Sequence, residues 1–147
     1  MTRKDKTLLI VDDSEIDRMV LKNILCNEFD IIEADSGYSA LEIILQKADC
    51  LDAILLDVSM PVLDGFGVLQ LMKEKNIDNL PVFMITAEAT RDNVQKATQF
   101  NISEFIKKPF EREDILKRLR LKLGVISNYN LTETDIEETY KYMSDLE

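Results

Sequence analysis

The chain has 147 residues, 46% hydrophobic and 31% charged, which fits one soluble globular domain and excludes a disordered protein. Its 28 acidic and 18 basic residues give a net charge of −10, which argues against nucleic acid binding through the overall field. Because histidine is absent, the chain has no histidine triad, histidine metal ligand or phosphohistidine of its own.

Cysteine content and hydrophobicity bear on where the protein works. Cys26 and Cys50 lack CxxC spacing and cannot form a zinc site, so we expect two reduced thiols. No apolar run approaches the ~18 residues of a membrane span, and the N-terminus has no signal-peptide core. We therefore expect a cytoplasmic protein without a membrane anchor.

Short apolar runs alternate with segments of helical periodicity. Continuous apolar runs at 8–11, 53–56 and 82–85 are typical of strands buried on both faces of a parallel sheet. Weaker strand patterns at 30–33 and 104–106 suit edge positions. Five helices are expected to follow the strands, each beginning near a possible cap: Ser14, Ser36, Asp64, Thr90 and Glu111. The alternation predicts an α/β fold, with a five-stranded parallel sheet covered by helices on both faces.

The apolar positions of each helix predict the face that meets the sheet. In the first helix these positions are Ile16, Met19, Val20 and Ile24. In the later helices they are Ala40, Leu41, Ile44 and Leu45, then Val68, Leu69 and Met72, then Val94, Ala97 and Thr98, and finally Ile115, Leu116 and Leu119.

The alternating unit is expected to end near residue 124. Residues 1–124 form the predicted domain, and residues 125–147 form an acidic extension. A loop and one helix from Thr132 are expected there, with an apolar stripe of Ile136, Tyr140 and Met143. This helix could be a solvated tail, a linker, a docking helix or a dimer helix, and the sequence leaves these alternatives open.

Polar side chains follow the predicted strands. The three continuous apolar runs lead into Asp12 and Asp13, into Asp57, and into Thr86, while the last strand leads into Lys108. The carboxyl ends of parallel strands share one sheet edge, so these residues should converge. Three neighbouring carboxylates need a cation, and Mg²⁺ prefers oxygen ligands. The sequence therefore predicts a Mg²⁺ site beside a lysine and a hydroxyl, a set that suits phosphoryl transfer.

Asp57 is the favoured nucleophile among these acids. A carboxylate can form a covalent aspartyl-phosphate, and Asp57 ends the strand expected at the centre of the sheet. The turn-rich residues 58–65 after it should leave its carboxylate accessible. Asp12 and Asp13 are then expected on the metal side.

Four segments resemble the receiver domain of two-component response regulators, the CheY-like family, over about residues 5–123. These segments are LLIVDDSE (8–15), ILLDVSMPVLDG (54–65), VFMITA (82–87) and FIKKPF (105–110). The resemblance implies a doubly wound, flavodoxin-like sheet with strand order 2-1-3-4-5.

The resemblance also implies a role for each matching residue. Asp57 would be the phospho-acceptor. The Mg²⁺ ligands would be Asp12, Asp13, Asp57 and the backbone carbonyl of Ser59, with Asp13 favoured as the direct ligand of the acidic pair. Lys108 would pair with the phosphoryl group, and Pro109 would be the cis-proline that follows it. Thr86 and Phe105 would form the switch, in which the Thr86 hydroxyl moves onto the phosphoryl group and the ring turns inward.

The implied function is a phospho-accepting signalling switch, not an enzyme beyond its own phosphorylation and slow dephosphorylation. A sensor histidine kinase or a histidine phosphotransfer protein would be the donor. Residues 90–123 would present the output to an effector protein or to an output domain missing from this chain. We expect a monomer or weak dimer that binds neither nucleic acid nor membrane.

Some features depart from the family pattern or leave other functions open. Phe105 replaces a common tyrosine, and Gly67 inside the third helix should cost ~1 kcal/mol. A phosphorylation-independent binding module and a fragment of a longer regulator are alternatives. An aspartate-based phosphohydrolase is disfavoured because the DxD motif and cap domain are missing. A flavodoxin-like electron carrier is disfavoured because the Ser/Thr/Gly-rich phosphate loop is missing.

Overall fold

The computed structural model describes residues 4–125, so the helix expected from Thr132 lies outside the described residues. The chain divides into two units between Phe110 and Glu111. In chain order, the first unit contains β1 (Thr7–Val11), α1 (Glu15–Leu25), β2 (Asp30–Ala34), α2 (Gly37–Lys47), the short 3-10 helix η1 (Ala48–Cys50), β3 (Ala53–Asp57), α3 (Gly65–Glu74), β4 (Val82–Thr86), α4 (Arg91–Ala97) and β5 (Glu104–Lys107). The second unit contains α5 (Arg112–Leu123). Among the residues described, no helix has both the length and the apolar character needed to cross a membrane.

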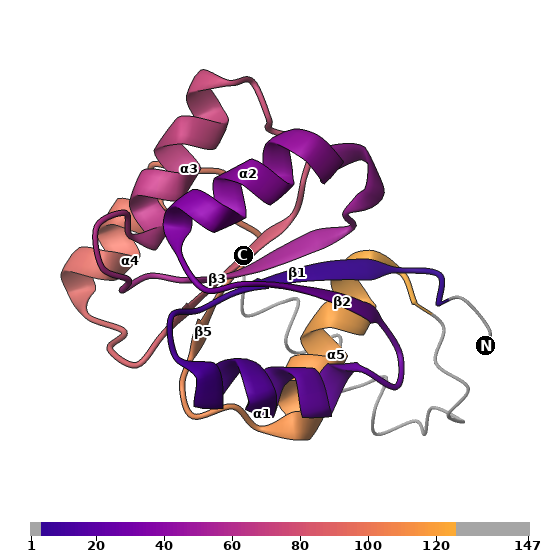
Figure 1. Ribbon diagram of the computed structural model, residues 1–147. Helices are drawn as coiled ribbons and strands as arrows, with labels where there is room; N and C mark the ends of the chain where they lie inside the picture. Colours follow the sequence, from indigo (N-terminus) through magenta and orange to yellow (C-terminus); the bar gives the residue numbers. More distant parts are fainter. Residues whose placement is uncertain (1–3, 126–147) are drawn as a thin grey trace. The chain divides into compact units, whose positions relative to one another are not determined.

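All five strands belong to one parallel sheet in the order β2-β1-β3-β4-β5 (Figure 1). The predicted fold class is confirmed, with β3 at the centre and β2 and β5 at the edges. Each strand is one residue longer than its predicted run, and in β3 and β4 the added residues are Asp57 and Thr86 at the carboxyl end. The two side chains therefore stand at the carboxyl edge of the sheet.

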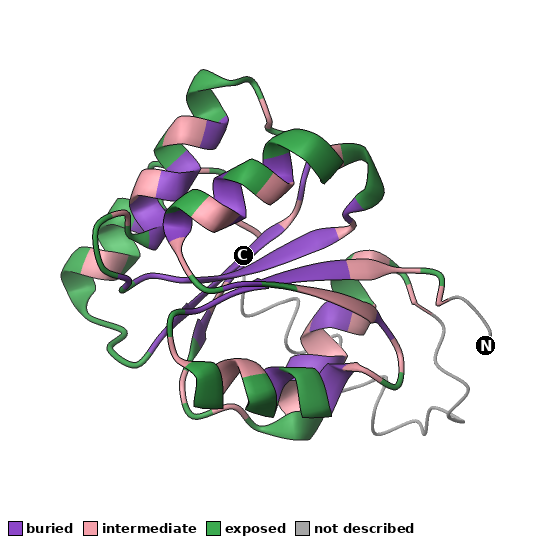
Figure 2. Cartoon of the chain, viewed as in Figure 1, coloured by how far each residue is buried: buried purple, intermediate pink, exposed green. Residues whose placement is uncertain are grey.

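The sheet of the first unit is covered on both faces. Helices α2 and α3 lie side by side on one face, and α1 lies on the other (Figure 1). The face toward α2 and α3 forms one buried cluster with these helices, to which the strands contribute Leu9, Val11, Ala34, Ile54, Leu56, Val82 and Met84. Strands β3 and β4 are buried along their whole length, while β2 is mostly half-buried (Figure 2). Burial on both faces explains the continuous apolar runs of the central strands.

The predicted cap residues begin the helices. Four side chains accept a hydrogen bond from a backbone N–H in the first turn of their helix, and these are Ser14, Ser36, Asp64 and Thr90. Ser36 and Ser39 also form a reciprocal capping box at the start of α2. Glu111 holds the N-cap position of α5 without a side-chain hydrogen bond, and Gly124 ends that helix in the left-handed conformation at φ 65°.

The predicted sheet-facing side of α1 was wrong at Ile16, Met19 and Val20, and only Ile24 of that set is buried. Ile16 is 73% exposed and Met19 62% exposed, whereas the buried residues of α1 are Leu21, Ile24 and Leu25. Compared with the prediction, the helix is rotated about its axis, so that the stripe with Leu21 and Ile24 faces the sheet. One turn earlier on that stripe is the half-buried Asp17, so a polar first turn faces the carboxyl edge of the sheet.

Two smaller expectations about helix faces were also wrong. Leu45 of α2 is 55% exposed, because Ala40, Leu41 and Ile44 already fill the contact with the sheet. In α4, Val94 and Thr98 are exposed, and Ala97 is the one residue of the helix in the buried cluster. A helix of seven residues offers room for little more than one buried side chain.

Candidate functional site

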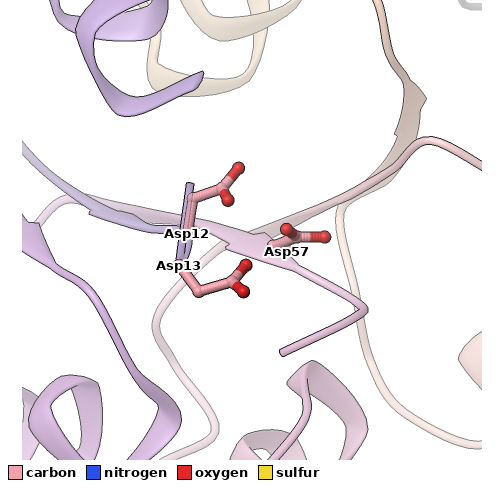
Figure 3. Close-up of side chains that lie close together, drawn as sticks. All are labelled: Asp12, Asp13 and Asp57. Carbon is pink, nitrogen blue, oxygen red and sulfur yellow. The ribbon is translucent and has the colours of Figure 1, made fainter. Parts of the chain in front are cut away.

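Three carboxylates meet at the carboxyl edge of the sheet. Asp12 and Asp13 follow β1, and Asp57 ends β3. One oxygen of each carboxylate lies within 4.8 Å of the corresponding oxygen of the other two (Figure 3). Asp12 and Asp57 are 1% and 5% exposed, whereas Asp13 is exposed. The convergence predicted from the strand ends is therefore present in the fold.

Backbone groups hold the two buried acids in place. The Ser14 N–H donates to Asp12 Oδ1 at 2.9 Å, and the Ser59 N–H donates to Asp57 Oδ1 at 3.2 Å. A guanidinium nitrogen of Arg18 donates to the Asp12 carbonyl oxygen at 2.7 Å, which ties α1 to the end of β1. With Oδ1 held by the Ser59 N–H, the other Asp57 oxygen, Oδ2, accepts from Lys108.

The lysine at the end of β5 brings positive charge to the acids. Lys108 Nζ lies 2.7 Å from Asp12 Oδ2, 2.7 Å from Asp17 Oδ2 and 3.3 Å from Asp57 Oδ2. Its backbone N–H donates to the Thr86 carbonyl oxygen at 2.7 Å, which holds the β5 end beside the β4 end. The ammonium group thus bridges residues contributed by β1, α1 and β3.

Burial and charge perturb two groups in this cluster. Burial, followed by the negative charge of Asp12, raises the pKa of Asp57 to about 6, although Lys108 opposes the change. Burial by itself would lower the pKa of Lys108, but hydrogen bonds to Asp12 and Asp17 and the charge of Asp57 outweigh burial and raise that pKa. At neutral pH the site therefore combines a firmly protonated lysine with a mostly ionised Asp57.

The two residues predicted to form the switch lie on β4 and β5. Thr86 is 2% exposed, and its hydroxyl donates to the Glu88 carbonyl oxygen at 3.0 Å and accepts from the Glu88 N–H at 3.0 Å. Asn93 of α4 also donates to the Glu88 carbonyl oxygen, at 3.1 Å. Phe105 is half-buried and pairs in register with Met84. The Thr86 hydroxyl is therefore engaged with the loop after β4 in this structure.

Two further predicted site residues flank the acids. Ser59 is exposed, two residues after Asp57, and a role for its carbonyl as a metal ligand stays a prediction. The peptide bond between Lys108 and Pro109 is cis.

Two residues of α1 belong to the site and were missed by sequence reasoning. Asp17 contacts Lys108, and Arg18 contacts the backbone of Asp12. The apolar stripe of Ile16, Met19 and Val20 predicts the opposite side of α1 as the one that faces the sheet, and that side contains neither residue. The spacing of Asp17 and Leu21 could have indicated this role. The two residues are four positions apart, which puts the carboxylate on the same helix face as a buried leucine.

Comparison with known proteins identifies the family. The sequence model of the response regulator receiver domain family matches residues 8–120, and this range contains every site residue named above. The chain belongs to this family.

Several relatives support the assignment. The chemotaxis protein CheY-3 of Vibrio cholerae is 35% identical over 119 residues, covering 79% of this chain and 90% of the relative. The chemotaxis protein CheY of Pseudomonas aeruginosa is 31% identical over 115 residues, covering 76% of this chain and 91% of the relative. A chain in the crystal structure of the CheX–CheY–BeF3–Mg²⁺ complex from Borrelia burgdorferi superposes with a TM-score of 0.73 at 30% identity. The match covers 81% of this chain and 90% of that chain. Sequence and fold agree on a CheY-like receiver domain of two-component signalling.

Proposed function

We propose that this receiver domain is a phospho-accepting switch in which Asp57 takes a phosphoryl group from a phosphohistidine on a partner protein. The observation that carries the proposal is the buried Asp57 carboxylate, which lies between Asp12 and the Lys108 ammonium group. Because these 147 residues contain no histidine, the donor phosphohistidine lies outside them, and we infer that it belongs to a sensor histidine kinase or a histidine phosphotransfer protein. A cytoplasmic location stays a prediction from the sequence.

The covalent step uses the Asp57 carboxylate as nucleophile. One of its oxygens attacks phosphorus, the P–N bond of the phosphohistidine breaks, and an acyl phosphate forms while the donor imidazole leaves as the neutral ring with one proton taken from solvent. Lys108 Nζ, 3.3 Å from Asp57 Oδ2, supplies positive charge for the phosphoryl oxygens. A pKa of about 6 leaves Asp57 mostly ionised at neutral pH, as a nucleophile requires. We infer that the chain modifies its own aspartate and loses the group slowly, without turning over an external substrate.

The acidic cluster fits a Mg²⁺ ion. Asp12, Asp13 and Asp57 offer hard oxygen ligands within 4.8 Å of one another, which is the ligand type that Mg²⁺ prefers. By resemblance, the Ser59 carbonyl would be a further ligand. When bound, Mg²⁺ would offset the negative charge of the phosphoryl oxygens. The related complex that contains BeF3 and Mg²⁺ supports this proposal.

The proposed relay begins at Thr86. Its hydroxyl, which donates to Glu88 here, would donate instead to a phosphoryl oxygen on Asp57. The half-buried ring of Phe105 would then move into the space that the Thr86 side chain leaves. Readout by residues 90–123, and the effector or output domain that receives it, stay predictions.

Intact mass spectrometry tests the proposal. The protein is incubated with Mg²⁺ and either acetyl phosphate or phosphoramidate, whose P–N bond resembles that of phosphohistidine. We expect the mass of one phosphoryl group to be added, with no gain in EDTA. Asp57→Asn should show no gain, while Asp49→Asn, which alters an exposed carboxylate, should react like the wild type.

Two results would contradict the proposal. A phosphoryl gain that persists in Asp57→Asn would place the acceptor elsewhere. Failure of the wild type with both small donors and with a phosphorylated histidine phosphotransfer protein would favour a binding module that does not use phosphate.

A further inference from the structure

The strongest unassigned feature of the site is the contact between α1 and the lysine. Asp17 Oδ2 lies 2.7 Å from Lys108 Nζ, although the two residues are 91 positions apart in the chain. The Lys108 side chain is 14% exposed and that of Asp17 is 35% exposed, so water only partly screens the pair. Asp17 is the one carboxylate of this network that comes from a helix, and it is outside the cluster that fits Mg²⁺.

The first turn of α1 holds Asp17 in this position. The Asp17 N–H donates to the Ser14 side-chain oxygen at 3.2 Å, which caps the helix. The next residue, Arg18, donates to the Asp12 carbonyl oxygen at 2.7 Å and anchors the same turn to β1. Since Leu21 is fully buried one turn later, the helix cannot easily rotate Asp17 away from the lysine.

The Lys108 ammonium group has fewer N–H donors than the phosphorylated site would have acceptor oxygens around it. An ammonium group donates three hydrogen bonds. Two short contacts of 2.7 Å go to Asp12 and Asp17, and the longest, at 3.3 Å, goes to Asp57. A phosphoryl group on Asp57 adds strong acceptor oxygens that also need this cation. Asp17 therefore competes with the phosphoryl group for Lys108 and adds negative charge near an anionic ligand.

We propose that Asp17 is a positioning residue that holds Lys108 back from the phosphoryl group and so weakens phosphoryl binding at Asp57. This inference rests on the proposed function, since it assigns Asp17 a regulating role at the same site. The carboxylate acts through the lysine and does not touch the phosphoryl group. Loss of its charge should tighten the binding of a phosphoryl mimic.

The test compares two variants that remove one negative charge from the same helix turn. Asp17→Asn removes the negative charge from the contact with Lys108. Glu15→Gln is the matched control, because Glu15 is exposed in the first turn and is not among the carboxylates that contact Lys108 in the described residues. Beryllium fluoride is titrated at saturating Mg²⁺, and binding is followed by amide NMR. We expect Asp17→Asn to bind about twofold to fivefold more tightly than Glu15→Gln, the range of a partly exposed ion pair.

Additional variants separate a positioning role from a structural one. Asp17→Ala should tighten binding as Asp17→Asn does, and Asp17→Glu, which keeps the charge, should return the affinity toward wild type. A purely structural role would lower the unfolding midpoint and weaken or leave unchanged the binding of beryllium fluoride. Tighter binding in both neutral variants is therefore the supporting result.

The inference is overturned if Asp17→Asn binds beryllium fluoride no more tightly than Glu15→Gln. The proposed function fails in a different way. In that case the wild type itself neither gains a phosphoryl group nor binds beryllium fluoride, so the two failures are distinguishable.

Discussion

Replacement of Asp57 by asparagine should stabilise the unphosphorylated protein at neutral pH. The Asp57 carboxylate is 5% exposed and lies beside Asp12, so its ionised form is disfavoured in the folded state. Burial and the charge of Asp12 raise its pKa from an ordinary 3.8 to about 6, and Lys108 offsets only part of that rise. Asparagine has nearly the same shape without the charge, so it removes this cost.

The size and sign of the effect follow from the pKa. A rise from 3.8 to about 6 corresponds to about 3 kcal/mol at most. Because the folded-state pKa is raised, the folded protein binds the Asp57 proton more tightly than the unfolded chain does. This contribution to stability is fully present below about pH 4 and is lost as the pH rises toward about 6. Asp57→Asn should therefore exceed the wild type in unfolding free energy above about pH 6, and the difference should shrink toward about pH 4.

Urea unfolding, followed by far-UV circular dichroism in EDTA, measures this difference. The midpoint of thermal unfolding should also rise, by about 2–4 °C for each kcal/mol. Asp49→Asn is the control, because it makes the same chemical change at an exposed site and should leave stability nearly unchanged. Excess Mg²⁺ should narrow the gap, since the wild type binds the ion with one more carboxylate.

A cost of ionising Asp57 in the folded protein is contradicted if Asp57→Asn is no more stable than the wild type near neutral pH. It is also refuted if the advantage of the variant is as large at about pH 4 as at about pH 7.5, because a cost of ionisation disappears when the carboxyl group is protonated.

Three further substitutions test the local structure, each by urea unfolding. Val62 is 93% exposed with φ 70°, so Val62→Gly should raise the unfolding free energy by about 1 kcal/mol, and a decrease would show that its backbone is unstrained. A Cβ at Gly65 would lie 2.4 Å from the Asp57 carbonyl oxygen, so Gly65→Ala should destabilise by about 2 kcal/mol and slow phosphoryl uptake; wild-type behaviour in both would contradict the clash. Ser36→Ala should cost about 1 kcal/mol, because the capping box with Ser39 is lost, and an unchanged midpoint would argue against that box.

The carboxylates of the site could be predicted because their positions depend on local pattern. An apolar run of four residues indicates a buried strand, and the polar residue that ends it lies at the edge of the sheet. In a parallel sheet those edges coincide, so Asp12, Asp13 and Asp57 had to converge once the strands were recognised. The predicted strand ends therefore agree with the observed ones to within one residue.

The environment of Gly67 illustrates what local pattern leaves out. From the sequence, a glycine inside a helix indicated only a cost in helix stability. In the structure, a Cβ at Gly67 would lie 2.5 Å from the Leu63 side chain, which packs against the core beside it. The absence of a side chain at Gly67 thus makes room for a neighbour from the loop before the helix.

The orientation of α1 was likewise decided by tertiary contacts. Its periodicity offered two faces, one with Ile16 and Met19 and one with Asp17 and Leu21. Hydrophobicity favoured the first, but the fold buries Leu21 and turns Asp17 toward Lys108. The sequence by itself determined the sheet, the strand ends and the candidate nucleophile, since these depend on residues close together in the chain. Only the tertiary structure assigned the partners of Lys108, because contacts across 91 and 96 positions leave no periodic trace in the sequence.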